Sequence, residues 1–133
     1  MPRWRCDCGG MLDWSSEMKL NPASWPGRAP DVWRYRESLP VTHSESIVSL
    51  GEGFTPLTEM SIDSGTIYVK QDYLFPTGSF KDRGASVLVS KIKEWGIEHC
   101  VEDSSGNAGS AIAAYCARRS EEHTSELQSP SAI

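Results

Sequence analysis

Two segments in the second half of the chain place apolar side chains at the spacing of an amphipathic helix. Within residues 80–95 the apolar positions stand at i, i+3, i+4 and i+7, as Ala85, Leu88, Val89 and Ile92. A second segment that begins near Asn107 has the same kind of spacing, with Ala108, Ala111, Ile112, Tyr115 and Cys116. Both patterns predict helices, and Gly96 is a natural stop for the first.

Runs of β-branched and aromatic residues between turn-forming segments predict strands. Residues 66–71 read Thr-Ile-Tyr-Val-Lys-Gln, and residues 99–102 predict a short buried strand. Loops at 76–79 and 104–106 precede the two helices, and Ser79 is a candidate N-cap. The order strand, loop, helix, strand, loop, helix is typical of an α/β fold with a mainly parallel sheet.

The two ends of the chain differ in character from this middle part. Residues 1–50 carry four tryptophans and few aliphatic side chains, so we expect an extension that wraps over the domain with its indoles as anchors. Residues 51–118 form the α/β part. Residues 119–129 lack an apolar stripe and resemble the translation of a sequencing adapter, although composition would also permit a native disordered tail. We therefore expect the native sequence to stop at Arg118 and assign no function to residues 119–133.

Composition and charge exclude several classes of function. The 133 residues carry a formal net charge of −5, which gives no electrostatic basis for binding nucleic acid. The sequence has no run of about 20 apolar residues that would cross a bilayer, and its N-terminus lacks the apolar stretch of a secretory signal. We expect a cytoplasmic protein with no membrane partner, whose four cysteines are thiols or metal ligands rather than disulfides.

A lysine stands at a loop-to-helix junction in the segment TGSFKDRGA, residues 77–85. Lys81 falls in the first turn of the predicted helix, where the partial positive charge of the helix terminus favours a neutral amine. A neutral amine is what a Schiff-base lysine needs, whereas an isolated lysine would be an ordinary surface residue. Asp82 complements the helix terminus, and Arg83 pairs with it or with a neighbouring carboxylate. Gly84 costs about 1 kcal/mol relative to alanine in a helix, which close packing would explain.

Together with Asp72, this segment resembles the pyridoxal-phosphate attachment site of the serine/threonine dehydratase and threonine synthase families. The resemblance implies that Lys81 bonds covalently to pyridoxal 5'-phosphate and moves protons at the Cα and Cβ of the substrate, while the cofactor is the electron sink. It also implies an enzyme of fold type II, of which this chain would be an N-terminal fragment.

A serine-glycine-asparagine turn, residues 104–109, lies between the second predicted strand and the second predicted helix. Loops at the carboxyl ends of parallel strands bind ligands, and the N–H groups at the helix start suit an anion. Taken alone, the turn is explained by helix capping. Beside the lysine segment, it resembles the asparagine loop of fold-type II enzymes. That resemblance implies that Asn107 contacts the 3′ oxygen of the cofactor and that Ser104 and Ser105 contact the carboxylate of the substrate.

Residues 51–57, GEGFTPL, resemble a stretch of threonine synthase-like proteins and separate them from plain dehydratases. Within this stretch, Thr55 either lines the site and contacts the substrate or stabilises a turn.

The cysteines fall into two pairs. Cys6 and Cys8 resemble half of a zinc knuckle, but a closed zinc site needs four ligands, so we expect a remnant without metal. Cys100 and Cys116 lie in a predicted strand and a predicted helix, where thiols pack as small hydrophobes.

The family resemblance implies a lyase that converts O-phospho-L-homoserine and water to L-threonine and phosphate, with a small amino acid as substrate and a parent protein that is a candidate homo-oligomer. Two alternatives stay open: a threonine or serine dehydratase, and a non-catalytic fragment. Because we find no later Gly-rich loop for the cofactor's phosphate in these 133 residues, we expect the chain to be inactive by itself.

Overall fold

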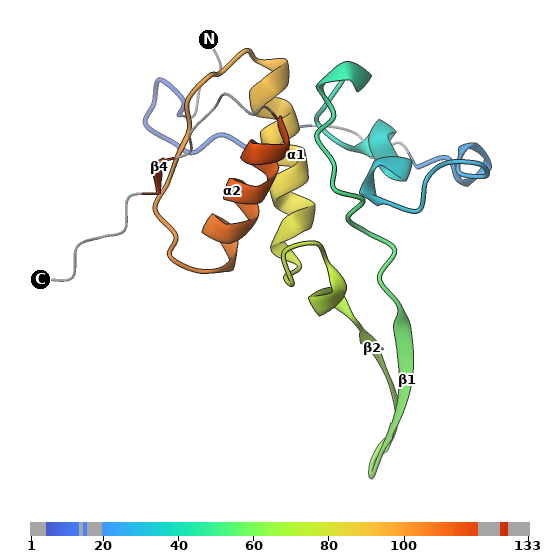
Figure 1. The fold of residues 1–133 in the computed structure, drawn as a ribbon. Helices are drawn as coiled ribbons and strands as arrows, with labels where there is room; N and C mark the ends of the chain where they lie inside the picture. Colours follow the sequence, from blue (N-terminus) through green and yellow to red (C-terminus); the bar gives the residue numbers. More distant parts are fainter. Residues whose placement is uncertain (1–4, 14, 16–19, 120–125, 128–133) are drawn as a thin grey trace, which may run out of the picture.

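A computed structural model describes residues 5–13, 15, 20–119 and 126–127 of the chain (Figure 1). Among these residues, single-turn or short 3-10 helices come first, then a pair of strands, then two α-helices with a second short strand pair. In chain order the elements are η1 (Pro22–Ser24), η2 (Val32–Ser38), η3 (Ser44–Ser46), β1 (Leu57–Ile62), β2 (Gly65–Lys70), η4 (Asp72–Leu74), α1 (Lys81–Glu94), β3 (Val101–Glu102), α2 (Asn107–Arg119) and β4 (Glu126–Leu127).

The two α-helices confirm the helical patterns in the sequence. They pack against each other and run in the same direction, so their N-terminal ends lie at the same end of the pair (Figure 1). Before α1, the hydroxyl of Ser79 accepts a hydrogen bond from the Lys81 N–H at 3.2 Å, so Ser79 caps the first turn although Phe80 holds the N-cap position. After α1, Gly96 takes the left-handed conformation with φ of 66° and donates to the Lys93 carbonyl, which ends the helix.

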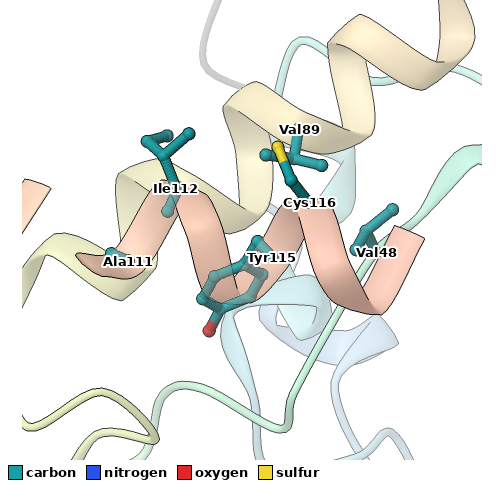
Figure 2. Close-up of a cluster of buried hydrophobic side chains, with 7 residues drawn as sticks. Val48, Val89, Ala111, Ile112, Tyr115 and Cys116 are labelled. Atoms are coloured by element: carbon teal, nitrogen blue, oxygen red, sulfur yellow. The ribbon is translucent and has the colours of Figure 1, made fainter. Parts of the chain in front are cut away.

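The hydrophobic core lies between α1, α2 and the segment that precedes β1 (Figure 2). The side chains of Val89, Ala111 and Tyr115 are completely buried there. These positions belong to the apolar faces that the sequence predicts for the two helices, so the helical periodicity identifies the core. The whole cluster consists of Val48, Ala85, Val89, Ala111, Ile112, Tyr115 and Cys116.

Strands β1 and β2 form an antiparallel hairpin that projects away from the helices (Figure 1). Leu57 lies opposite Lys70, and Ile62 lies opposite Gly65 at the turn. Strand β2 confirms the strand predicted at residues 66–71. Strand β1 was missed because its sequence, Leu-Thr-Glu-Met-Ser-Ile, does not alternate strictly between apolar and polar residues.

The second strand pair joins β3 to β4 in parallel over two residues each. The α/β class is therefore confirmed. Among the described residues, however, the longer sheet is antiparallel, so the mainly parallel sheet stays a prediction. Strand β4 comes from the segment that resembles an adapter translation. Residues 120–125 and 128–133 lie outside the described residues.

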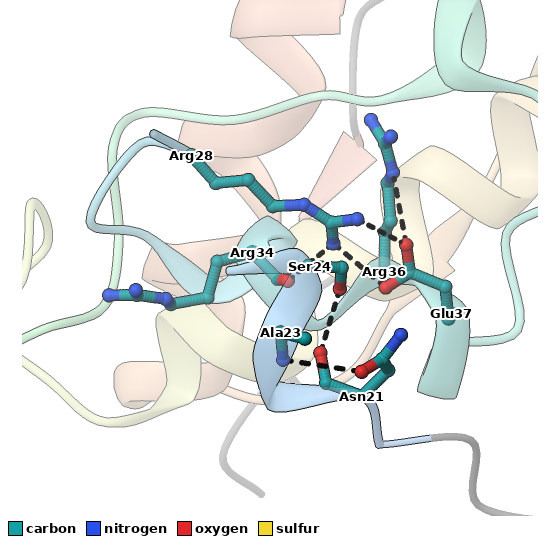
Figure 3. Close-up of polar contacts among 7 residues, drawn as sticks. All are labelled: Asn21, Ala23, Ser24, Arg28, Arg34, Arg36 and Glu37. Atoms are coloured by element: carbon teal, nitrogen blue, oxygen red, sulfur yellow. Dashed lines mark hydrogen bonds and ion pairs between the residues drawn. The ribbon is translucent and has the colours of Figure 1, made fainter. Parts of the chain in front are cut away.

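Polar contacts within the N-terminal segment hold its 3-10 helices η1 and η2 in shape (Figure 3). Arg28 donates to both carboxylate oxygens of Glu37, at 2.8 and 2.5 Å, and ties η2 to the turn before it. Trp33 in η2 is buried, and the Trp25 ring meets the Tyr35 ring edge-on at 5.0 Å. The expected use of indoles as anchors is thus confirmed at Trp33. The tryptophans at positions 4 and 14 lie outside the described residues.

Cys6 and Cys8 are exposed on a tight turn in which the Gly9 N–H donates to the Cys6 carbonyl at 2.9 Å. In the described part of the chain, no three potential ligand side chains of histidine, cysteine, aspartate or glutamate gather in one place. None of the described helices combines the length and the apolar character needed to cross a membrane.

Candidate active site

Lys81 is the first residue of α1, and its side chain is exposed. Its ammonium nitrogen lies 5.0 Å from the centre of the Phe80 ring. Within the residues that the structure describes, no carboxylate forms an ion pair with it. The amine is therefore accessible to a ligand from solvent.

The loop before Lys81 is held in place by a buried carboxylate. The Asp82 side chain has no exposed surface, and it accepts hydrogen bonds from the Thr77 N–H at 2.9 Å and from the Thr77 hydroxyl. Asp82 also lies in the first turn of α1, where a negative charge suits the helix terminus. The aspartate that follows the lysine therefore fixes the conformation of the loop that leads to it.

Arg83 pairs with Asp72, the neighbouring carboxylate, and not with Asp82. Two guanidinium nitrogens contact the two Asp72 oxygens, at 2.5 and 3.0 Å, in a bidentate arrangement. The Arg83 guanidinium holds the pKa of the Asp72 carboxyl below its usual value, and a hydrogen bond from Thr55 acts in the same direction. The pair therefore fastens η4 to α1 next to the lysine.

The Thr55 hydroxyl donates to Asp72 at 2.8 Å, and its side chain is buried. Thr55 also lines a cavity of about 300 Å³ together with Lys70 and Arg83, and Lys81 does not line it. The structure thus gives Thr55 a bond that stabilises the local fold. A contact between Thr55 and the substrate stays a prediction.

The serine-glycine-asparagine turn leads into α2. The Ser104 hydroxyl accepts from the Gly106 N–H at 3.2 Å, and the Ser104 N–H donates to the Glu102 carboxylate at 3.1 Å. Ser105 and Asn107 are exposed, and Asn107 is the first residue of the helix. The turn presents polar side chains at the helix N-terminus, as the sequence predicted.

Lys81 and Asn107 therefore begin two helices whose N-terminal ends lie at the same end of the molecule (Figure 1). The positive ends of both helix dipoles point to this side. An exposed amine, an exposed amide and two positive helix ends suit an anionic ligand with an aldehyde group. This donor set fits a phosphorylated aldehyde cofactor such as pyridoxal phosphate.

Sequence reasoning missed the residue that holds this arrangement together. Glu52 is completely buried in the GEGFTPL stretch and accepts a hydrogen bond from the Tyr115 hydroxyl of α2 at 2.9 Å. It also accepts from the Trp33 indole N–H at 3.1 Å and from the Leu50 N–H at 2.8 Å. Burial raises the pKa of the Tyr115 phenol, and the adjacent Glu52 carboxylate raises it further. Glu52 therefore joins the extension, the loop before β1, and α2.

The same network reaches α1. The Trp33 indole N–H also lies 3.0 Å from the Ser86 hydroxyl, which donates to the Val48 carbonyl at 2.8 Å. The Ser90 hydroxyl accepts from the Val48 N–H at 2.8 Å. Through these bonds, two serines on the buried side of α1 satisfy the backbone of the segment that crosses over it.

The backbone of the GEGFTPL stretch explains its second glycine. Gly53 has φ of 126°, and a Cβ atom placed on it would lie 2.7 Å from the Val32 nitrogen. Phe54, the next residue, has φ of 51°. The glycines on either side of Glu52 are the signal in the sequence that marks this stretch as one of unusual backbone conformation, but they do not indicate which groups the Glu52 side chain bonds.

Comparisons of the sequence with known proteins identify a family and several relatives. A family model described as pyridoxal-phosphate dependent enzyme matches residues 48–124, which is more than half of the chain. The threonine synthase of Methanocaldococcus jannaschii is 42% identical over 130 residues, covering 86% of this chain and 31% of the relative. The threonine synthase of Methanosarcina acetivorans is 37% identical over 119 residues, covering 84% of the chain and 29% of the relative. The threonine synthase of Halalkalibacterium halodurans is 47% identical over 88 residues, covering 63% and 25% respectively.

Proposed function

The chain belongs to the family of pyridoxal-phosphate dependent enzymes, and we propose that its parent protein is a threonine synthase. The chain spans about a third of the length of the curated relatives that it matches. From this part of the chain we therefore propose the activity of the whole protein, which is to convert O-phospho-L-homoserine and water to L-threonine and phosphate. The observation that carries the proposal is Lys81, exposed at the start of α1, the helix whose N-terminal end lies at the same end of the molecule as that of α2.

Each candidate residue has a role in this proposal. Lys81 bonds covalently to the cofactor through its amine and carries protons to and from the Cα and Cβ of the substrate. Asn107 donates its amide to the ring oxygen of the cofactor. Ser104 and Ser105, with the N–H groups of α2, hold the substrate's carboxylate. When bound, pyridoxal 5'-phosphate supplies the electron sink for the charge that develops at Cα.

The residues around Lys81 position it. Asp82 fixes the preceding loop, and the ion pair of Arg83 with Asp72 fastens η4 to the helix. We place Thr55 at the edge of the substrate site, supported by its hydrogen bond to Asp72, whose partner Arg83 lies two residues after Lys81. We also propose that residues 51–118 belong to a mainly parallel α/β domain of fold type II. The parallel run of the two helices supports that fold.

The test uses the full-length parent, purified with pyridoxal phosphate. Reduction with borohydride should attach the cofactor to the peptide that contains Lys81, and phosphate should be released from O-phospho-L-homoserine. A Lys81→Ala variant should lose the adduct and at least about 10³-fold in kcat. Lys93→Ala, on the same helix with its ammonium bonded to the Glu45 carbonyl, is the matched control and should keep both.

The alternatives give different results in the same assay. Release of ammonia and a 2-oxo acid from threonine or serine, without phosphate release from phosphohomoserine, would identify a dehydratase. A parent that binds no cofactor at Lys81 would be a non-catalytic homologue, and the proposal would fail.

We further propose a small amino-acid substrate and a cytoplasmic protein that binds neither nucleic acid nor membrane. The net charge of −5 and the four free cysteines support this proposal. Light scattering of the purified parent measures whether it is a homo-oligomer.

A further inference from the structure

Cys100 and Cys116 place their sulfur atoms next to each other. Cys100 lies directly before β3, Cys116 lies in α2, and their Sγ atoms are 3.6 Å apart. A disulfide bond is about 2.0 Å long, so the two sulfurs must approach by about 1.6 Å to form one. The two residues are 16 positions apart in sequence, so a disulfide between them would close a ring that contains the intervening chain.

The two thiols differ in environment. Cys116 is buried in the core cluster beside Val89 and Tyr115 (Figure 2), and burial raises the pKa of its thiol to about 11. Cys100 is half-buried and packs against the edge of the same cluster. A small reagent from solvent therefore reaches Cys100 first, and Cys116 is placed to attack the product from the core side.

We propose that Cys100 and Cys116 are a redox-sensitive pair that is oxidised by small-molecule disulfides of the glutathione type. The Cys100 thiolate attacks one sulfur of oxidised glutathione and displaces the other half as a thiol. The Cys116 thiol then loses its proton to solvent and attacks the Cys100 sulfur in the mixed disulfide, which releases the second glutathione thiol. Two protein thiols and one oxidised glutathione thus give one protein disulfide and two reduced glutathiones.

The position of this pair decides what oxidation changes. The covalent ring would contain β3 and the whole serine-glycine-asparagine turn, with Asn107 inside it. Oxidation therefore ties the C-terminal half of α2 to the residue that precedes β3, and the turn between them lies inside the ring.

The experiment uses the full 133-residue chain with Cys6→Ser and Cys8→Ser, so that only the pair can react. Incubation with oxidised glutathione should remove two thiols per chain. Digestion should then give one peptide that joins Cys100 to Cys116, with no bound glutathione. Adding Cys100→Ser to the same background should stop ring formation. A chain that keeps both thiols, or that stops at a glutathione adduct on Cys100, would overturn the proposal.

A second measurement tests whether the fold itself brings the two thiols together. The equilibrium constant for ring formation should be at least roughly tenfold larger in buffer than in urea, because the fold brings the sulfurs together. Equal constants in the two solvents would show that the fold does not preform the pair and would also overturn it.

Discussion

The α1–α2 pair and the β1–β2 hairpin lie next to each other in sequence but differ sharply in how their side chains are used. The helix pair buries a continuous core and a completely buried carboxylate, Glu52, that bonds to groups from several segments. In the hairpin, every side chain is exposed except Val69, which is half-buried. Backbone hydrogen bonds between β1 and β2 hold the hairpin together, whereas contacts between buried side chains hold α1 against α2.

This difference shows where single substitutions should matter. In the helix pair, a lost contact leaves a cavity or an unpaired polar group, and either one costs free energy. In the hairpin, a substitution changes a side chain that already faces solvent. The helix pair should therefore carry the stability of the chain, while the hairpin should tolerate change.

The largest expected effect is at Glu52. Replacing it by alanine leaves the Leu50 N–H and the Tyr115 hydroxyl without their buried acceptor and removes one of the two acceptors of the Trp33 indole. We expect Glu52→Ala to lower the free energy of unfolding by about 3 kcal/mol or more, measured by urea unfolding with circular dichroism. Glu59→Ala, on the exposed face of β1, is the control and should change it by less than about 0.5 kcal/mol. Equal losses would abolish the contrast between the two regions.

Two glycines sharpen the comparison at the boundary of the regions. An alanine at position 53 would meet the Val32 backbone at a φ that alanine rarely adopts, so Gly53→Ala should lower the free energy of unfolding by about 2 kcal/mol.

No atom lies within 4 Å of a Cβ placed on Gly84, so the close packing expected there is not found in the described residues. Gly84→Ala should therefore raise the free energy of unfolding by about 1 kcal/mol, in the same urea experiment. A loss of stability in Gly84→Ala would contradict the open space around this position.

A third contrast compares an apolar side chain of the core with one of the hairpin. Val89 has no exposed surface, whereas Ile67 in β2 is 40% exposed. Truncating Val89 to alanine leaves a cavity between the helices and should cost about 2 kcal/mol. Ile67→Ala should cost less than about 1 kcal/mol, although it removes more atoms. Thermal unfolding of the two variants side by side tests this order, and a larger loss at Ile67 would show that the hairpin is packed.

Acid should affect the helix pair through Glu94. Its buried carboxylate is bonded to Lys91 and to the N–H groups of Thr42 and His43, and these bonds, led by that from Lys91, lower its pKa to about 2. A lowered folded-state pKa gives stability above the ordinary value of 4.5, and this stability is lost as the pH falls towards 2. Glu94→Gln should remove about 1.5 kcal/mol at pH 7 and flatten the acid limb of stability against pH. Glu59→Gln should leave that limb unchanged, and an unchanged limb in Glu94→Gln would contradict the assignment.

The sequence predicted the parts of the fold that depend on local periodicity. Both α-helices and β2 follow from spacing, and the apolar position of Tyr115 correctly predicted its burial. The partner of its hydroxyl could not be predicted, because Glu52 lies 63 positions away and has no local signal for direction. Strand β1 lacks an alternating pattern and owes its structure to pairing with β2.

The candidate site was predictable in composition but not in contacts. The sequence placed Lys81 and Asn107 at helix starts, and the structure puts those starts at one end of the molecule. Whether Arg83 would choose Asp82 or Asp72 depended on the three-dimensional position of η4, which no pattern in the sequence fixes.

The parallel run of α1 and α2 has a consequence for how the chain folds. The bonds that close the molecule join residues far apart in sequence: 52 positions between Thr42 and Glu94, 53 between Trp33 and Ser86, and 63 between Glu52 and Tyr115. Contacts of such long range form slowly. During synthesis, α1 must leave the ribosome and wait for Tyr115 to emerge before its apolar face is covered. That interval is when the growing chain is most open to aggregation and to capture by chaperones.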